Sequence, residues 1–399
     1  MIRSIEGLRG VAALLVALFH VYVFGKWGGL PAAVGVLQHA WLFVDLFFVI
    51  SGFVMAAAYS DRIGSAPALA GFMIRRFFRL YPLHLVTTLS VIAAVIAVQS
   101  VKWLLASRGI VMGGERPFAV EFFDLPYFGL ELLLLQGVGL MQKEIHNYPS
   151  WSISVEFWMY GLFGLFLLGV RTGWLRVVLS ALIVLVCILH FVSFWSIAPP
   201  TLLTLDTQGL PRGLLSFFTG VLVFHVWQFT GPSLARLAER RAAVLGLLQV
   251  GAALLALLLV DRQQTLGIGQ LTIPFAFALL VWLLLPDVGL LARWLQTAPM
   301  QWLGMHSYAI YLTHITVQTV LDWPGRTLPE PWKHGVGIVF VVSVCLLSAL
   351  CYRTIEIPWR ERGKRIARRI EAAGAGKSGA GSGTGSGSDG VDRSRPQPV

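Results

Sequence analysis

Eleven long apolar segments follow one another along the chain, and they constrain its fold more than any other feature. Of the 399 residues, 56% are hydrophobic and only 13% are charged, whereas about a quarter of the residues in soluble proteins are charged. Because a helix needs about 20 apolar residues to cross a bilayer, the sequence predicts an all-α, polytopic membrane protein. The segments lie near residues 8–26, 37–59, 82–106, 122–141, 151–170, 175–196, 212–230, 242–260, 268–286, 302–321 and 335–354.

The distribution of charge favours ten spans over eleven. Basic residues gather on the cytoplasmic side of membrane proteins, and ten of the 31 here lie from Arg353 onward. All basic clusters fall on one side if segment 122–141, which Pro126 interrupts, folds back or lies at the outer face. We therefore predict about ten transmembrane helices with cytoplasmic N- and C-termini. The net charge of +11 is then explained by basic residues that flank the spans on the cytoplasmic side. The sequence contains no nucleic-acid recognition motif.

Two regions differ in composition. Residues 1–360 form the predicted transmembrane domain, and residues 361–399 form a basic and then Gly/Ser-rich cytoplasmic tail. A basic helix over 357–370 would suit an anionic inner leaflet, and residues 373–399 offer little to bury, which predicts flexibility. Neither the three cysteines, which lie inside apolar segments, nor the spacing of the histidines indicates a metal site.

Four titratable residues lie at membrane depth, where such groups are costly and mark candidate functional sites. Counting about 1.5 Å per residue, His20 and His314 lie about 18 Å from the cytoplasmic edge, Asp45 about 21 Å and Glu156 about 24 Å. This layer is compatible with general acid–base chemistry, with a proton relay, or with hydrogen bonds that only hold helices together.

A set of arginines lies on the predicted cytoplasmic side of this layer. Arg9 and His20 are eleven residues apart, so they share one helix face and are separated by about 16 Å along it. Arg75, Arg76 and Arg79 follow the second span. They either anchor the topology or, together with Arg9, bind a polyphosphate, because guanidinium groups pair with phosphates. A donor with phosphates and a long arm, such as coenzyme A, would fit this spacing.

Five motifs, in this order, resemble the acyltransferase 3 family of integral membrane O-acyltransferases, and the resemblance covers roughly residues 3–360. One departure is Phe43, which stands where the family often has glycine. The motifs are Ser4-Ile-Glu-Gly-Leu-Arg-Gly-Val-Ala-Ala running on to His20, Phe43-Val-Asp-Leu-Phe-Phe-Val-Ile-Ser-Gly-Phe53, Arg75-Arg-Phe-Phe-Arg-Leu-Tyr-Pro82, Pro149-Ser-Trp-Ser-Ile-Ser-Val-Glu156 and Ser307-Tyr-Ala-Ile-Tyr-Leu-Thr-His314.

The resemblance implies transfer of an acyl group, commonly acetyl, from cytoplasmic acyl-CoA to a hydroxyl of a surface or exported carbohydrate. It implies no permanently bound cofactor, and its setting is the inner (plasma) membrane of a bacterium. The implied roles are general base or acyl carrier for His20, and donor binding for the arginines. We expect Glu156 or Asp45 to orient His20.

Further candidates for the site are His314, Ser154 and Tyr308, although serine in a helix and tyrosine near an interface are more typical of packing and anchoring. The alternative function is a transporter or flippase of a polar or lipid-linked solute. It is less favoured because the sequence shows no inverted repeat with paired interrupted helices.

Overall fold

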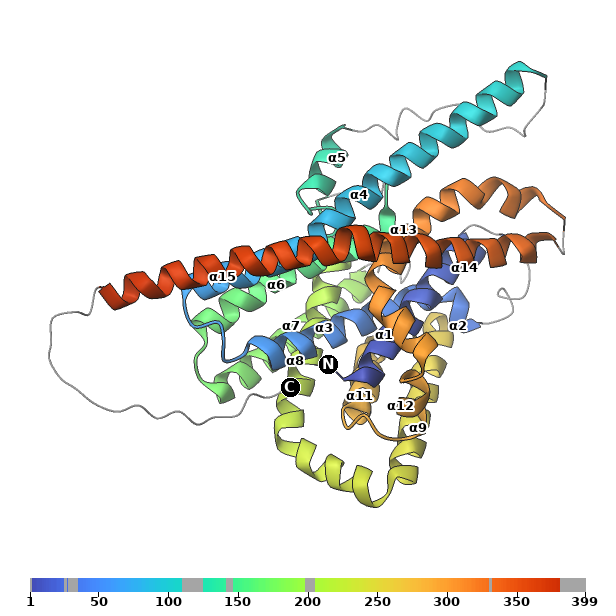
Figure 1. The fold of residues 1–399 in the computed structure, drawn as a ribbon. Helices are drawn as coiled ribbons and strands as arrows, with labels where there is room; N and C mark the ends of the chain where they lie inside the picture. Colours follow the sequence, from blue (N-terminus) through green and yellow to red (C-terminus); the bar gives the residue numbers. More distant parts are fainter. Residues whose placement is uncertain are drawn as a thin grey trace, which may run out of the picture.

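The structure, a computed structural model, describes residues 2–24, 27, 35–109, 125–140, 146–197, 205–329 and 332–380. These residues form helices and turns and contain no β-strand, so the all-α prediction is confirmed (Figure 1). The helices are α1 (Arg3–Phe19), η1 (His20–Phe24), α2 (Gly35–Gln38), η3 (Ala40–Leu42), α3 (Phe43–Tyr59), α4 (Ala66–Ser107), α5 (Leu125–Leu132), η5 (Tyr148–Ser150), α6 (Trp151–Gly169), α7 (Gly173–Ile197), α8 (Leu205–Arg240), α9 (Ala242–Asp261), α10 (Gln263–Leu266), η7 (Gly267–Thr272), α11 (Ile273–Leu284), α12 (Leu290–Leu295), α13 (Ala298–Thr327), α14 (Trp332–Cys351), η8 (Tyr352–Glu356) and α15 (Ile357–Ala380).

Nine helical segments within the described ranges are long and apolar enough to cross a membrane. The remaining predicted span, 302–321, lies in α13, which carries more polar residues but packs inside the bundle against α1, α4 and α14. Its burial against other helices allows this polarity, because polar side chains in a membrane protein face the bundle interior. The chain is therefore a multi-pass membrane protein.

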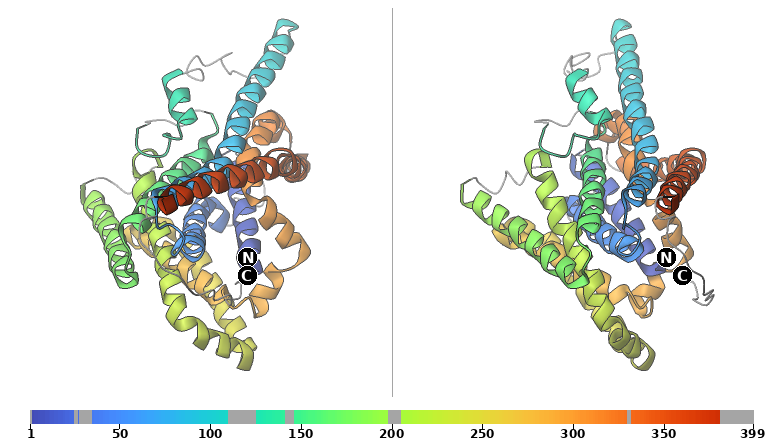
Figure 2. Two further views of the ribbon diagram at one scale, coloured as in Figure 1. Left: turned by 60° about the vertical axis from the view of Figure 1, so that its left-hand side comes forward. Right: turned by 90° about the vertical axis from the view of Figure 1, so that its left-hand side faces the viewer.

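Segment 122–141 was predicted not to cross. Of this segment the structure describes 125–140, where α5 has only eight residues and a series of turns follows it. A helix of this length extends about 12 Å, which is too short for a bilayer core of about 30 Å. Figures 1 and 2 show α5 at the end of the molecule toward which the C-terminal half of α4 projects.

The predicted boundary at residue 360/361 falls inside α15. Helix α14, the π-helix η8 and α15 follow one another without a break, and α15 runs along the N-terminal half of α4 (Figure 1). The helix predicted to end at 370 continues to Ala380, and residues 381–399 lie outside the described part. The extension is explained by contacts with α4, since Glu371 forms an ion pair with Arg75 at 2.8 Å.

Glycines allow the central helices to approach closely. A Cβ on Gly10 of α1 would lie 2.4 Å from the backbone nitrogen of Gly304 in α13, and a Cβ on Gly304 would lie 2.2 Å from the carbonyl oxygen of Glu6. Small residues at such crossings let membrane helices pack by backbone contact. This crossing fixes α1 beside α13, the two helices that carry the histidines predicted from the sequence.

We expect Gly10→Ala to destabilise the protein by roughly 1–3 kcal/mol, because the added methyl group overpacks a contact between backbones. Thermal unfolding in detergent, followed by the loss of monodisperse protein on size exclusion, measures this effect. Gly251→Ala is the matched control, since a Cβ there meets nothing within 4 Å. Equal melting temperatures for the two variants would show that the α1–α13 crossing is not tightly packed.

Candidate active site

Two buried histidines meet at the centre of the bundle. Nε2 of His314 in α13 lies 3.0 Å from Nδ1 of His20, which begins the π-helix η1 at the end of α1. The side chains are 0% and 7% exposed, respectively. Single-turn π-helices occur frequently at functional sites because they locally change the direction of side chains. Two of the predicted site residues, 294 positions apart in the chain, are therefore in direct contact.

The hydrogen bonds of this pair favour one arrangement of protons. Nδ1 of His314 lies 3.2 Å from the carbonyl oxygen of Ile310, and Nδ1 of His20 lies 2.9 Å from that of Val16. Carbonyl oxygens only accept hydrogen bonds, so both Nδ1 atoms are assigned as N–H donors. Nε2 of His314 is then the acceptor for His20, and the basic lone pair of His20 is on its Nε2. A neutral imidazole with a basic nitrogen can act as a general base.

The predicted arginines gather at one end of the bundle, here called the arginine end (Arg9, Arg75, Arg76 and Arg79). Arg76 donates to the Tyr59 hydroxyl at 3.2 Å and lies over the rings of Tyr59 and Tyr160. Arg9 contacts Glu6 at 3.8 Å. Arg79 interacts electrostatically with Glu6, Glu156 and Glu356. Cations from α1 and α4 therefore share one polar cluster, because Arg9 and Arg79 both interact with Glu356.

Glu356 was not predicted and lies within this cluster. It ends the π-helix η8, is buried, and interacts electrostatically with Arg79, Arg360 and Arg9. A buried carboxylate between cations limits their mutual repulsion and holds them in place. Its position after the last apolar segment gave no signal, because a glutamate there is equally typical of a solvated helix end.

Asp45 has a different partner from the one that we expected. Its carboxylate accepts three hydrogen bonds from Arg212 of α8, at 2.7–3.1 Å, and one from Ser216 at 2.9 Å. The guanidinium also lies over the rings of Trp41 and Trp151. This arrangement satisfies a buried charge and ties α3 to α8. Arg212 could have been suspected only as a basic residue at the edge of an apolar segment.

Glu156 is also engaged away from the histidines. It accepts hydrogen bonds from the hydroxyls of Ser51, at 3.0 Å, and Tyr160. Because Arg79 also interacts with Glu156 electrostatically, this carboxylate belongs to the polar cluster of the arginine end. Of the four residues predicted at similar depth, the two histidines thus contact each other, and the two carboxylates bond to other partners.

Ser154 and Tyr308 form contacts with the backbone. The Ser154 hydroxyl donates to the carbonyl oxygen of Leu134 at 2.6 Å and accepts from the amide of Gly137 at 3.1 Å. The Tyr308 hydroxyl donates to the carbonyl oxygen of Leu80 at 2.6 Å, directly after Arg79. Ser154 therefore stabilises the turns that follow α5, and Tyr308 ties α13 to α4.

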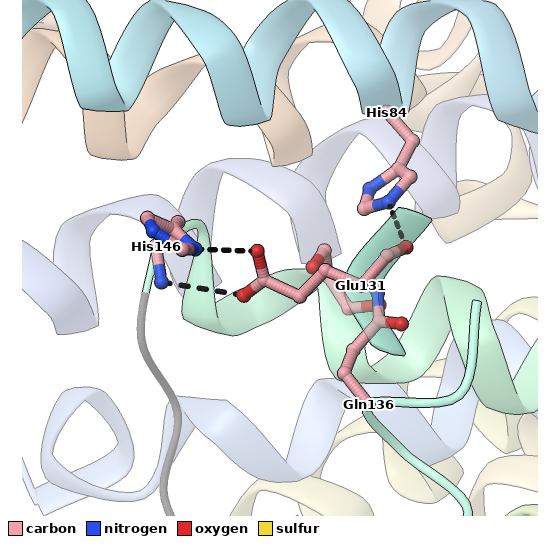
Figure 3. Close-up of polar contacts among 5 residues, drawn as sticks. His84, Glu131, Gln136 and His146 are labelled. Atoms are coloured by element: carbon pink, nitrogen blue, oxygen red, sulfur yellow. Dashed lines mark hydrogen bonds and ion pairs between the residues drawn. The ribbon is translucent and has the colours of Figure 1, made fainter. Parts of the chain in front are cut away.

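Residues 146–150, which precede α6, position an aromatic ring against His20. His146 bonds to the carboxylate of Glu131 through its Nδ1, at 2.6 Å, and through its backbone amide, at 3.3 Å (Figure 3). Gln136 donates to Ser150. With the segment held in this way, the ring of Tyr148 lies 5.0 Å from that of His20, edge to face.

A multi-pass helical bundle with a buried histidine pair, and with a cluster of cations that begins about three helical turns away along α1, has the features of a membrane-embedded transferase. A model of the acyltransferase domain matches residues 2–352. The chain therefore belongs to the acyltransferase 3 family, and it is an enzyme that transfers acyl groups. Within the described ranges, no group of three or more His, Cys, Asp or Glu side chains is arranged to hold a metal ion.

Three curated relatives show the breadth of similar proteins. Acyltransferase MdmB of Streptomyces mycarofaciens is 30% identical over 79% of this chain and 78% of its own length. Exopolysaccharide production protein ExoZ of Rhizobium meliloti is 27% identical over 84% of this chain and 93% of its own. Peptidoglycan O-acetyltransferase OatA of Listeria monocytogenes is 23% identical over 91% of this chain, which spans 56% of that relative. No solved structure matches the chain significantly.

Proposed function

We propose that the protein is a membrane O-acyltransferase that moves an acyl group, acetyl in the simplest case, from cytoplasmic acyl-CoA to a hydroxyl of a cell-surface or exported carbohydrate. The observation that carries this proposal is the buried contact between His20 and His314. The tautomer assigned to His20 provides a basic nitrogen in the interior of the bundle, about 16 Å along α1 from Arg9. The inner membrane of a bacterium is the corresponding location.

In the proposed reaction, His20 acts as the general base for direct transfer of the acyl group from the thioester to the hydroxyl. Nε2 of His20 removes the proton from the acceptor hydroxyl, and the oxygen attacks the carbonyl carbon of the thioester. The new C–O bond forms, the C–S bond breaks, and the proton on Nε2 passes to the leaving sulfur to give the free thiol. His314 accepts the hydrogen bond from Nδ1 of His20 and thereby stabilises the imidazolium. In a covalent variant, Nε2 attacks the thioester carbon and the C–S bond breaks to release the thiolate. The acceptor oxygen then attacks the acyl group, the C–N bond breaks, and the proton of the hydroxyl passes to the thiolate.

The polar cluster of the arginine end supports binding of the donor. Phosphates of acyl-CoA would contact Arg9 and Arg79, because guanidinium groups form charge-assisted, bidentate hydrogen bonds with phosphate. The arm of the donor would then extend past Tyr308 toward His20. In this proposal Glu356 and Glu156 position these cations.

The relatives guide the choice of acceptor. One is named for peptidoglycan O-acetylation and another for exopolysaccharide production, and both names involve carbohydrates. We extend only this shared chemistry, a sugar hydroxyl, to the present chain. The transporter alternative receives no specific support, because a transporter does not need the cation cluster to hold a phosphorylated donor.

The test uses purified protein in liposomes with labelled acetyl-CoA on the arginine-rich side and a cell-envelope glycan extract on the other. An acyltransferase releases free thiol and transfers label to the glycan in equal amounts, and both stop when either substrate is omitted. Release of thiol without acylated glycan would contradict the proposed acceptor. Movement of solute with no thiol release would favour the transporter.

We expect Arg79→Gln to raise the KM for acetyl-CoA about 10- to 100-fold, because a hydrogen bond to a charged group contributes about 1.5–3 kcal/mol. The KM for the acceptor should stay unchanged. Arg236→Gln is the control, since Arg236 is exposed and its side chain bonds only within its own helix. An unchanged KM for acetyl-CoA in the Arg79 variant would remove this arginine from the donor site.

A further inference from the structure

A pocket of about 230 Å³ lies between the C-terminal halves of α4 and α13, on the side of the histidine pair away from the arginine end. Each helix contributes one face to it. Val95, Val98, Gln99 and Lys102 are spaced at three and four residues along α4, as are Ile315, Thr319, Asp322 and Arg326 along α13, so each set projects from a single helical face. Gln99 follows Arg79 by 20 positions, or about 30 Å along the helix.

The base of this pocket adjoins the reactive histidine. Tyr148 lines the pocket, and its ring lies 5.0 Å from that of His20. Gln318 also lines it and donates from Nε2 to the backbone carbonyl of His20 at 2.9 Å. The Oε1 atom of Gln318 is buried and has no hydrogen-bond partner within the described structure. Solvent does not reach this oxygen, so Gln318 acts here through its hydrogen bond to the backbone of His20.

The lining has the chemistry of a site for a hydroxyl-rich ring. Amide groups of Gln99 and Gln318 and the hydroxyl of Thr319 can exchange hydrogen bonds with hydroxyls, while the half-exposed indole of Trp323 offers an apolar face. Asp322 is neutralised by Arg326 at 2.8 Å and also accepts from the indole of Trp27, so it does not attract a cation. The volume lies below the 300–1,000 Å³ or so typical of pockets for drug-sized ligands, which fits one ring better than a chain.

We propose that this pocket binds a single pyranose unit of the acceptor and directs one of its hydroxyls toward His20. This inference rests on the proposed function, and it adds the position of the acceptor site and the residues that select it. Donor and acceptor would then approach the histidine pair from opposite ends of the bundle. The two substrates would meet only at His20.

Binding is tested without catalysis by protection of an introduced thiol. In Val98→Cys the thiol lines the pocket, and its alkylation by N-ethylmaleimide is followed by mass spectrometry with and without a panel of methyl pyranosides. Alkylation should slow about fivefold or more with at least one sugar at saturation, because a pocket ligand excludes the reagent from most of the wall that it covers. Val101→Cys is the matched control, since Val101 is 56% exposed on the same helix and does not line the pocket.

The same protection measured in a His20→Ala background separates the two proposals. Protection that persists without transfer supports the pocket independently of the chemistry. If no pyranoside protects Val98→Cys, or if Val101→Cys is protected equally, the pocket is not the sugar site, whatever the activity shows. Transfer to other acceptors with no protection would retain the acyltransferase and reject this site.

Steady-state kinetics provides a second test of the sugar site. We expect Trp323→Ala to raise the KM for the protecting pyranoside about tenfold, because the loss of a ring face that the bound sugar would cover costs on the order of 1–2 kcal/mol. The KM for acetyl-CoA should stay unchanged. Trp103→Ala, at an exposed tryptophan outside the pocket, should change neither constant. Equal acceptor constants for the Trp323 variant and the wild type would overturn the assigned stacking role.

Discussion

Replacing His20 with alanine is expected to reduce acyl transfer about 10²–10⁴-fold, the range that a general base contributes. The loss follows from the assigned tautomer, because the hydrogen bonds of Nδ1 put the basic lone pair of His20 on Nε2. Label from acetyl-CoA, followed into glycan and into protein in membranes that contain equal amounts of each variant, measures the effect. Transient label on the wild-type protein, absent from the variant, would identify the covalent route.

Two further histidine variants make this expectation specific. His334→Ala is the control, since the side chain of His334 is exposed, and it should transfer at the wild-type rate. His314→Ala should lose less activity than His20→Ala, because Nδ1 of His20 keeps the carbonyl oxygen of Val16 as an acceptor. Transfer at the wild-type rate in His20→Ala would contradict the assigned role of His20.

The second large effect concerns stability. Asp45→Asn removes the negative charge opposite Arg212, whose side chain is only 11% exposed. Breaking a buried pair in this way costs about 3–5 kcal/mol because the remaining charge stays buried without compensation. We therefore expect a much smaller yield of monodisperse protein and a lower melting temperature in detergent. Specific activity per folded molecule should change far less than the yield.

Two comparisons test this structural interpretation. Asp261→Asn is the exposed control, because the pair of Asp261 with Arg262 is solvated and such pairs contribute about 0–1 kcal/mol. Replacing both members, as in Asp45→Met with Arg212→Leu, should restore much of the lost stability, since apolar pairs often replace buried ion pairs without loss. A well-folded Asp45→Asn protein with no activity would instead return Asp45 to the catalytic site.

Several elements of the site were predictable from residue spacing alone. The 3.6-residue period placed Arg9 and His20 on one face of α1, and counting along each span gave His20 and His314 the same depth. The contact between the two rings confirms that their shared depth was meaningful. Asp45 and Glu156, predicted at similar depths, have Arg212 and Ser51 as partners, because depth along the membrane normal says nothing about which helices are neighbours.

The sequence by itself determined that the chain is a helical, multi-pass membrane protein with cations on one side and titratable groups inside, because hydropathy and helical period act locally. Only the tertiary structure decided the partners. Asp45 bonds to Arg212 because α3 packs on α8. Glu356 lies near the arginines because η8 and α15 pack against α4. These pairings depend on lateral packing between helices that are far apart in the chain. Side-chain shape and glycine contacts select this packing, and no single segment encodes it.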